Sequence, residues 1–495
     1  MLNLSYLESA SVLLHNAAKY GNESSIKASL FAGAKVNTTN EDGRTALLEA
    51  VINGHGGVVA ELLDAGANAN AIDKTGRTAL LEAARKRFEA IVEMLLDAGA
   101  DANATANNGD TALLEATRNK DEVIVEMLLD AGADANACAK DGSTALMEAG
   151  YYGCDKIVEM LLHADAFDDD GYYILSQAAI QGHEGVVKML AININANINE
   201  ALYTAAVFGC KGSILKILLD AGADANIIGS WGGSALYLAT TYGHEGMVKV
   251  LLDAGADVNV TNTSGVLILL NAAKQGYEGI VKMLLDAGVD VNTTDRTGNS
   301  ALPEASKNGH EGIVKMLLDA GADADVTDTT GNPVLLEAAR NGHEGIVRML
   351  LHAGADANAT DRTGNLALPE AVKNGHEGIV KMLLYASLDA NIVDGIEDLA
   401  LPTAARNGHE VIMKMLLESG VDSNKFDKDG YTPLQLAAQA GHENIVKLLL
   451  AANVNIDQRP KDRNGISLHQ AIANGHLSIV KLLGESGAAS NTRNK

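Results

Sequence analysis

The sequence is poor in two residue types, and each shortage argues against a class of structure. Only three cysteines occur in 495 residues, Cys138, Cys154 and Cys210, and no two of them form a C-x-x-C pair. We therefore expect neither a disulfide framework nor a zinc site, and the count is typical of a reducing compartment. Aromatic residues make up 4% of the chain. This shortage, beside abundant Ala, Leu and Gly, favours small, closely packed helices over a large sandwich or barrel.

Positive charge and long apolar runs are scarce as well. Lys and Arg number 38 against 64 Asp and Glu, which gives a formal net charge of -26. That balance argues against nucleic acid or an anionic membrane as the partner, because phosphate binding needs a basic face. No stretch approaches the roughly 20 apolar residues that span a bilayer, and the first ten residues lack the pattern of a secretory signal. We expect a soluble intracellular protein of the cytoplasm.

Self-similarity is the strongest signal that the sequence does contain. The leucine that opens the pattern ALLEA, or a variant of it, recurs in steps of 33 residues, as from Leu47 to Leu80. Two steps are shorter: 29 residues separate Leu146 from Leu175, and 27 separate Leu175 from Leu202. Such a period predicts an array of small units, fifteen in all, each of which buries its apolar face against its neighbours.

A single unit can be interpreted residue by residue. One copy reads DGRTALLEAVINGHGGVVAELLDAGANAN. Thr45 is a good N-cap, because its hydroxyl can accept a hydrogen bond from an unpaired N–H at a helix start. Gly54 ends this short first helix, Val58 and Leu62 belong to the apolar stripe of a second helix, and Gly66 ends that one. The unit is thus a helix pair followed by an extended turn.

These residues resemble the ankyrin repeat. The shared features are the period, openings similar to G-x-T-P-L-H, the G-H pair before the second helix and the ending L-L-x-x-G-A-D-x-N. Thr432, Pro433 and Leu434 form the closest copy of the opening, whereas most units have Thr-Ala-Leu-Leu or Ala-Leu-Pro. The resemblance covers residues 11–490. It implies an all-α solenoid of stacked helix pairs with β-hairpin-like fingers, irregular in the middle, and we expect a monomer.

The repeat and its departures divide the chain into five segments. They are an N-terminal capping unit (1–39), regular ankyrin repeats (40–162), two shortened irregular repeats (163–228), regular ankyrin repeats (229–456), and a C-terminal capping unit with a tail (457–495).

Most of the thirteen histidines belong to the repeat itself. Nine occupy the G-H position, about one period apart, and we expect them to form a structural ladder that bonds the backbone. They are His55, His183, His244, His310, His343, His376, His409, His442 and His476. Only His163 and His352 lie outside the repeat pattern, both at the end of a second helix.

Aromatic residues gather in the irregular stretch from Tyr151 to Tyr242. By resemblance, the two residues before the G-H position face the concave groove of the array and are polar in regular units. Here they turn aromatic, and with other aromatic residues nearby they form the candidate binding set: Tyr151, Tyr152, Tyr173, Phe208, Trp231 and Tyr242. Exposed aromatic clusters are typical of contact sites. In the alternative interpretation, these side chains only fill space left by the shortened units.

Basic residues occupy the same positions on both sides of the aromatic centre, with Arg118 and Lys274 nearest to it. An acidic protein or peptide segment could lie along such a stripe. Alternatively, these cations pair within their own helices, because Glu residues such as Glu82 and Glu115 lie three positions before Arg85 and Arg118. Pairs of this kind stabilise a helix by about 0.2–0.5 kcal/mol without a ligand.

A second function remains open at this point. The candidate catalytic residues are His163, Asp165, Asp168, Tyr152 and Tyr172, because a histidine near carboxylates in an aromatic pocket suits acid–base chemistry on a small molecule. A cofactor-free isomerase or cyclase, or a small-molecule binder, would fit. No phosphate-binding loop, zinc signature or other metal motif is present, so we expect neither cofactor nor metal. The favoured hypothesis is a scaffold that binds a protein or peptide in its concave groove.

Overall fold

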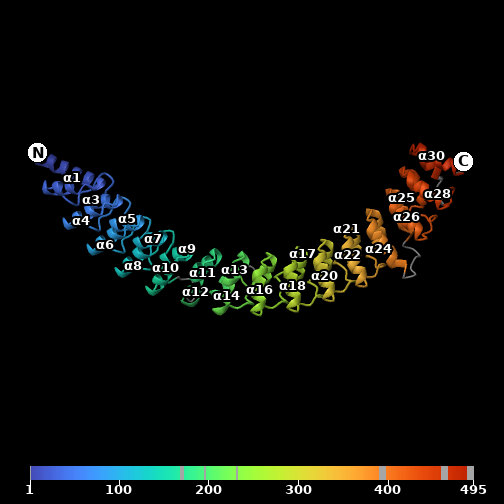
Figure 1. The fold of residues 1–495 in the computed structure, drawn as a ribbon, viewed down its shortest axis with the longest axis horizontal. Helices are drawn as coiled ribbons and strands as arrows, with labels where there is room; N and C mark the ends of the chain where they lie inside the picture. Colours follow the sequence, from blue (N-terminus) through green and yellow to red (C-terminus); the bar gives the residue numbers. More distant parts are fainter. Residues whose placement is uncertain are drawn as a thin grey trace. The chain divides into compact units, whose positions relative to one another are not determined.

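The computed structural model describes residues 2–167, 172–193, 197–229, 232–388, 397–458 and 467–487. Over these residues the chain forms thirty helices in fifteen consecutive pairs, with β-structure limited to isolated bridges (Figure 1). The all-α prediction and the number of units are confirmed. The helices group into two compact blocks, residues 1–256 (the N-terminal block) and 257–495 (the C-terminal block).

The N-terminal block contains eight helix pairs. Its first helices are α1 (Leu2–Tyr20), α3 (Ala46–Ile52), α5 (Ala79–Lys86), α7 (Ala112–Arg118), α9 (Ala145–Tyr152), α11 (Tyr172–Gln181), α13 (Ile198–Phe208) and α15 (Ala235–Thr241). Its second helices are α2 (Glu23–Phe31), α4 (Gly56–Asp64), α6 (Glu89–Asp97), α8 (Glu122–Asp130), α10 (Asp155–His163), α12 (Glu184–Asn193), α14 (Gly212–Asp220) and α16 (Glu245–Asp253).

The C-terminal block contains seven pairs. Its first helices are α17 (Ile268–Gln275), α19 (Ala301–Lys307), α21 (Val334–Asn341), α23 (Ala367–Asn374), α25 (Glu397–Asn407), α27 (Pro433–Ala440) and α29 (Ser467–Ala473). Its second helices are α18 (Glu278–Asp286), α20 (Glu311–Asp319), α22 (Glu344–His352), α24 (Glu377–Leu388), α26 (Glu410–Glu418), α28 (Glu443–Ala451) and α30 (Leu477–Glu485).

Both blocks are built in two layers. Within each block, the first helices of consecutive repeats pack against one another, and so do the second helices. The core lies between the layers, where Leu47, Val59 and Leu62 are 1% exposed or less. Full burial of such a side chain contributes about 1.5–3 kcal/mol relative to exposure. As expected, the Thr45 hydroxyl accepts a hydrogen bond from the Leu48 N–H and caps α3.

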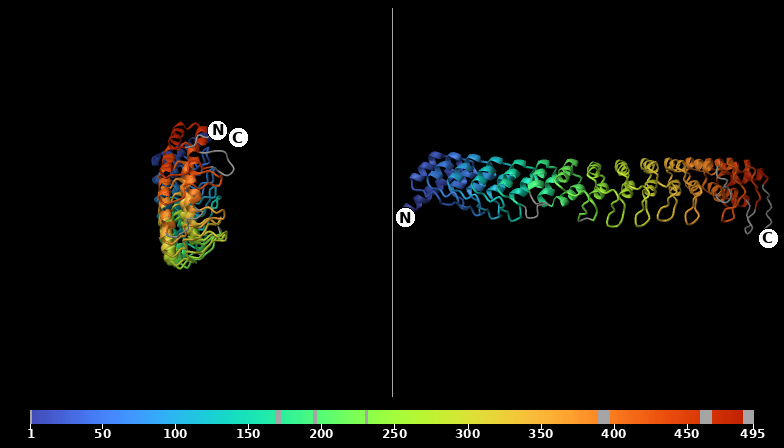
Figure 2. Two further views of the ribbon diagram at one scale, coloured as in Figure 1. Left: turned by 90° about the vertical axis from the view of Figure 1, so that its right-hand side faces the viewer. Right: turned by 90° about the horizontal axis from the view of Figure 1, so that it is seen from below.

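The fingers between repeats turn on a carboxylate or amide side chain. In the C-terminal block they project on one side (Figure 2). At one tip, Asp328 Oδ1 accepts hydrogen bonds from Thr330 N (2.9 Å), Thr330 Oγ1 (2.7 Å) and Asn332 N (2.9 Å). Burial alone would raise the pKa of Asp328, but these hydrogen bonds outweigh it and hold the pKa below its usual value of 3.8. The amide of Asn262 accepts equivalent bonds from two backbone N–H groups.

A contact between glycine and histidine joins most neighbouring repeats. The glycine after a first helix has a positive φ, +78° at Gly309, and the ring of His343 from the next repeat lies over it. A Cβ at Gly309 would be 2.8 Å from that ring, so glycine is needed for both the backbone and the contact. His343 Nε2 is 3.3 Å from the Lys307 carbonyl oxygen, and eight of the nine G-H histidines reach such a carbonyl. The predicted ladder is confirmed.

Two connections in the N-terminal block are shortened, and aromatic side chains fill part of the space. Only residues 194–197 join α12 to α13, where a regular connection such as 65–78 carries a finger. Tyr203 is 1% exposed and its ring packs over Gly229, where an added Cβ would be 2.5 Å away. Tyr172 Oη is 3.1 Å from Thr204 Oγ1, and Tyr237 is 6% exposed. Tyr172 and Tyr203 stand on the helices that follow the two shortened connections, as the space-filling interpretation expects.

A similar departure occurs once in the C-terminal block. Helix α24 continues to Leu388 and helix α25 begins at Glu397, so both are longer than their counterparts in neighbouring repeats. The sequence carries a signal for it, because Tyr385, Ala386 and Ser387 stand where most repeats have Asp-Ala-Gly. Without that glycine the second helix has no left-handed residue to end on.

We expect His343→Ala to lower the free energy of unfolding by about 1–2 kcal/mol, because it removes one hydrogen bond and the ring that covers Gly309. His352→Ala is the matched control: this histidine is exposed at the end of the same second helix, and the change should cost less than about 0.5 kcal/mol. Urea unfolding measures both. Equal losses in the two variants would contradict the role given to the ladder.

The finger carboxylates should make stability fall in acid. A folded pKa below 3.8 means that the stabilisation is complete above the unfolded pKa and is lost as pH falls through the folded pKa. Asp328→Asn keeps the turn, as Asn262 does, but removes the charge. We expect its melting temperature to lie below that of the wild type at pH 6 and to converge with it near pH 2. A constant difference at both pH values would show that the charge plays no part.

Candidate functional site

The ends of the first helices lie side by side and are joined by an asparagine. In seven repeats the residue before the positive-φ position is Asn, and in six of them its side chain bonds backbone carbonyls of its own helix or of the preceding repeat. Other repeats have Lys86, Gln181, Gln275 or Ala440 there. Asn119 Nδ2 donates to the Arg85 carbonyl at 2.9 Å, and Asn374 Nδ2 donates to the carbonyls of Glu370 at 2.9 Å and Arg340 at 3.3 Å. Asn53, Asn308, Asn407 and Asn474 make similar bonds. This asparagine is therefore part of the scaffold.

Four repeats of the N-terminal block have an aromatic residue at this position, Tyr20 in the first repeat and Tyr152, Phe208 and Tyr242 in later ones. Tyr152, Phe208 and Tyr242 stand in its place and are 39%, 57% and 48% exposed. None of the three has an amide that could make the asparagine's bond to a carbonyl. The exchange gives up a structural hydrogen bond and places apolar surface in solvent. The rings of Tyr152, Phe208 and Tyr242 are thus exposed at helix ends, and we call these three residues the aromatic row.

Tyr152 sits in a small arrangement of its own. Its ring meets that of Tyr151 edge to face, with centroids 5.2 Å apart and planes at 82°, and Tyr151 is 46% exposed. Lys120 Nζ lies 5.1 Å from the Tyr152 ring centroid and donates to the Tyr152 carbonyl at 3.3 Å. His183 Nε2, 3.0 Å from the Tyr151 carbonyl oxygen, ties this helix end to the next repeat. Lys120 and His183 thus hold the end of this helix in place, while the rings of Tyr151 and Tyr152 remain exposed to solvent.

The other end of the aromatic row is supported in the same way. Tyr242 stacks on His244 of its own repeat, with ring centroids 6.0 Å apart and planes at 27°. His244 Nε2 lies 3.3 Å from the Val207 carbonyl oxygen, one residue before Phe208. The histidine ladder therefore fixes the backbone on which the aromatic row is carried.

Two predicted binding residues lie outside this row. Tyr173 is 53% exposed, but it stands at the start of α11, the end opposite the row. Trp231 lies outside the described residues, as does Asp168.

The cations beside the row are mostly occupied. Arg118 pairs with Asp110 at 2.8 Å and with Glu148 at 3.0 Å, and Lys274 reaches Glu304 at 4.0 Å. The alternative of self-paired cations is correct for Arg85, Arg340 and Lys373, each bonded to the Glu three positions before it. Burial and the neighbouring carboxylate of Asp110 raise the pKa of Glu115 above its ordinary value.

The comparison with family models agrees with this geometry. A model of ankyrin repeats, three copies long, matches residues 14–106, 98–170, 113–201, 175–262, 202–295, 236–328, 269–361, 302–394, 368–462 and 401–494. The chain belongs to the ankyrin-repeat family. No curated protein matches the ankyrin array at a significant level. Ankyrin repeats generally mediate protein–protein interaction.

The candidate catalytic residues of the ankyrin array are spread over both layers and both helix ends. His163 is exposed at the end of the second helix α10, without a hydrogen bond or ion pair to any described residue. Asp165 is exposed in the turn that follows, where its φ is +56° and its carbonyl accepts a bond from Asn136. Tyr172, at the start of α11, bonds Thr204 of α13, whereas Tyr152 is the last residue of α9. The described contacts do not join these side chains into one site.

The cysteines Cys154 and Cys210 take the histidine position in two repeats of the array. Burial raises the pKa of the Cys154 thiol and raises that of Cys210 to about 11. The positive charge of Lys120 partly opposes this effect at Cys154. A thiol that stays protonated at neutral pH is a poor nucleophile. Both cysteines are small, partly buried side chains at the histidine position.

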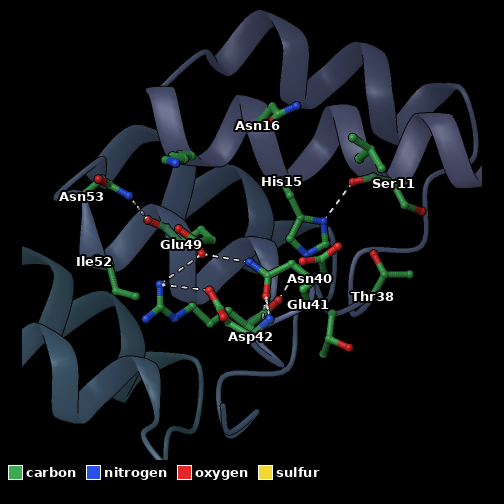
Figure 3. Close-up of a pocket in the computed structure, with 14 residues that line it drawn as sticks. Ser11, His15, Asn16, Thr38, Asn40, Glu41, Asp42, Glu49, Ile52 and Asn53 are labelled. Atoms are coloured by element: carbon green, nitrogen blue, oxygen red, sulfur yellow. Dashed lines mark hydrogen bonds and ion pairs between the residues drawn. The ribbon is translucent and has the colours of Figure 1, made fainter. Parts of the chain in front are cut away.

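A cavity that sequence reasoning missed lies between α1, the first finger and α3 (Figure 3). Its volume is about 600 Å³. His15 lies 2.9 Å from the Ser11 carbonyl and 3.2 Å from that of Arg44, and buried Glu49 accepts a bond from Asn40 at 3.0 Å. The polar side chains of His15 and Glu49 thus already bond other groups of the protein. No sequence motif marks this place, because the cavity is formed by ordinary repeat positions.

The described residues lack two further kinds of feature, a metal-binding cluster and a membrane-spanning helix. No group of three or more His, Cys, Asp or Glu side chains among them is arranged to hold a metal ion. Over the same residues, no helix combines the length and hydropathy needed to cross a membrane.

The thiol pKa values predict selective alkylation. At pH 8, iodoacetamide should modify exposed Cys138 at least about tenfold faster than Cys210, because little of the buried thiol is ionised. The rate at Cys210 should rise about tenfold per pH unit toward pH 11. Mass spectrometry of digests gives each rate. Rapid modification of Cys210 at pH 7 would show an activated thiol and would support the hypothesis that the protein is an enzyme.

Proposed function

We propose that the chain is a protein-binding scaffold and that the aromatic row, with Tyr151 beside it, is its contact surface. The observation that carries this is the replacement of a structural asparagine by Tyr152, Phe208 and Tyr242 in three repeats that lie close together. The exchange loses a side-chain hydrogen bond to the backbone and exposes an aromatic ring, and neither change stabilises the fold.

The chemistry of the row suits a protein partner. A tyrosine has a large apolar ring and a hydroxyl that bonds well to backbone, and it loses little conformational entropy when it is buried. Burying an aromatic side chain contributes about 1.5–3 kcal/mol. Tyr151, Tyr152 and Tyr242 are already oriented by contacts with a neighbouring ring, so less ordering is needed on binding. The row therefore offers preorganised anchors.

The chain itself supplies the variant that tests this. Tyr152→Asn, Phe208→Asn and Tyr242→Asn together restore the asparagine of regular repeats. We expect the melting temperature to stay equal or to rise, and the proteins that wild type retains from an extract of its host to be lost. Affinity enrichment with quantitative mass spectrometry measures retention, and calorimetry measures the melting temperature.

The control removes aromatic surface elsewhere. Phe31, Tyr385 and Phe426 are 96%, 66% and 37% exposed and lie away from the ends of the first helices. Changing these three to Asn should leave retention as it is in wild type. Equal retention by wild type and by the triple variant of the row would overturn the proposal.

A further inference from the structure

The aromatic row has a spacing that selects the backbone of its partner; this inference rests on the proposed function. The first helices α9, α11, α13 and α15 pack in sequence within the N-terminal block. At their ends the corresponding residues are Tyr152, Gln181, Phe208 and Tyr242, one for each repeat. Packed helices lie about 8–10 Å apart. The row therefore offers one anchor position about every 8–10 Å, with a polar position second in line.

Only some partner conformations match this spacing. A polyproline II segment rises about 3.1 Å per residue with three residues per turn, so every third side chain points the same way about 9 Å further on. Successive side chains of a β-strand point to opposite faces, so two residues that are three positions apart also point to opposite sides. An α-helix buries a stripe that is two or three side chains wide. Apart from Tyr151 beside its first ring, the row is one side chain wide, which favours the polyproline II segment.

The charge next to the row adds a second constraint. Two repeats before Tyr152 the same position is Lys86, which is exposed and makes no ion pair with any described residue. Lys120, beside the Tyr152 ring, bonds only a carbonyl. Arg85 and Arg118, in contrast, are held by carboxylates. Two amino groups are thus available at one end of the row.

Acidic residues limit this basic area. Glu122 starts α8 beside Lys120 and bonds Lys156 at 3.1 Å, and Asp155 starts α10. Carboxylates in the partner are therefore accommodated opposite Lys86 and Lys120 but not along the whole row.

We propose that the partner is an extended, proline-containing protein segment in the polyproline II conformation. It places an apolar side chain at every third position opposite Tyr152, Phe208 and Tyr242, a polar one opposite Gln181, and carboxylates opposite Lys86 and Lys120. The direction in which the segment runs along the row is an outcome of the test.

The proposal can be tested with synthetic peptides and the full chain. The in-register probe is a fluorescein-labelled peptide of sequence EPPEPPLPPQPPLPPL, used also in reversed order. Fluorescence anisotropy should show saturable binding of one of the two orders. A peptide of the same composition with leucines spaced by four residues should bind at least about tenfold more weakly. Replacing both glutamates by glutamine, or Lys86→Gln with Lys120→Gln, should weaken binding about threefold to tenfold at low salt.

Three outcomes would overturn this inference: equal affinity for the two leucine spacings, no binding of the in-register probe in either order, or tighter binding of an Ala-rich helical peptide with leucine at every seventh position. Each of these leaves the proposed function standing if the asparagine variant of the row still loses its retained proteins. Binding of the in-register probe that survives in the asparagine variant would locate the peptide site elsewhere.

Discussion

The fold depends on contacts between neighbouring repeats, because a single helix pair is too small to bury its own apolar face. The glycine–histidine contact shows how closely one repeat is fitted to the next. Gly309 needs a positive φ to end its helix, and the missing side chain leaves room for the ring of His343. The histidine in turn bonds a carbonyl near the end of the preceding first helix. One residue pair thus ends a helix and sets the position of the next repeat.

Where this contact is absent, the chain replaces it with other chemistry. Arg87 and Lys120 take the glycine position with φ of +62° and +57°, and the next repeat then has no histidine. Instead, Asp121 bonds Arg87 at 3.1 Å, and Cys154 follows Lys120. A side chain in the glycine position would collide with an imidazole, so the histidine is absent from the repeats that follow Arg87 and Lys120. This altered stretch leads directly into the aromatic row and supplies Lys120 to its first ring.

Six aromatic residues of the middle stretch fall into two groups. Tyr172 bonds Thr204, and Tyr203 and Tyr237 are buried, so these three side chains pack within the array. Tyr152, Phe208 and Tyr242 replace an asparagine that the scaffold uses, and they stay in solvent. Aromatic residues thus stabilise the fold within the first helices and form an exposed surface at the ends of these helices.

The sequence by itself determined the helix pairs, their number, the helix N-caps such as Thr45 and the histidine ladder. Each of these follows from a pattern that recurs with one period. The sequence also placed Tyr151, Tyr152, Phe208 and Tyr242 at the ends of first helices. Only the tertiary structure decided that Arg118 is held by Asp110 and Glu148 and that Tyr203 is buried. These contacts join residues of different repeats or of a finger and a helix, and side-chain reach across such gaps has no periodic signal. For the same reason the structural role of the asparagine became visible only through its carbonyl partners.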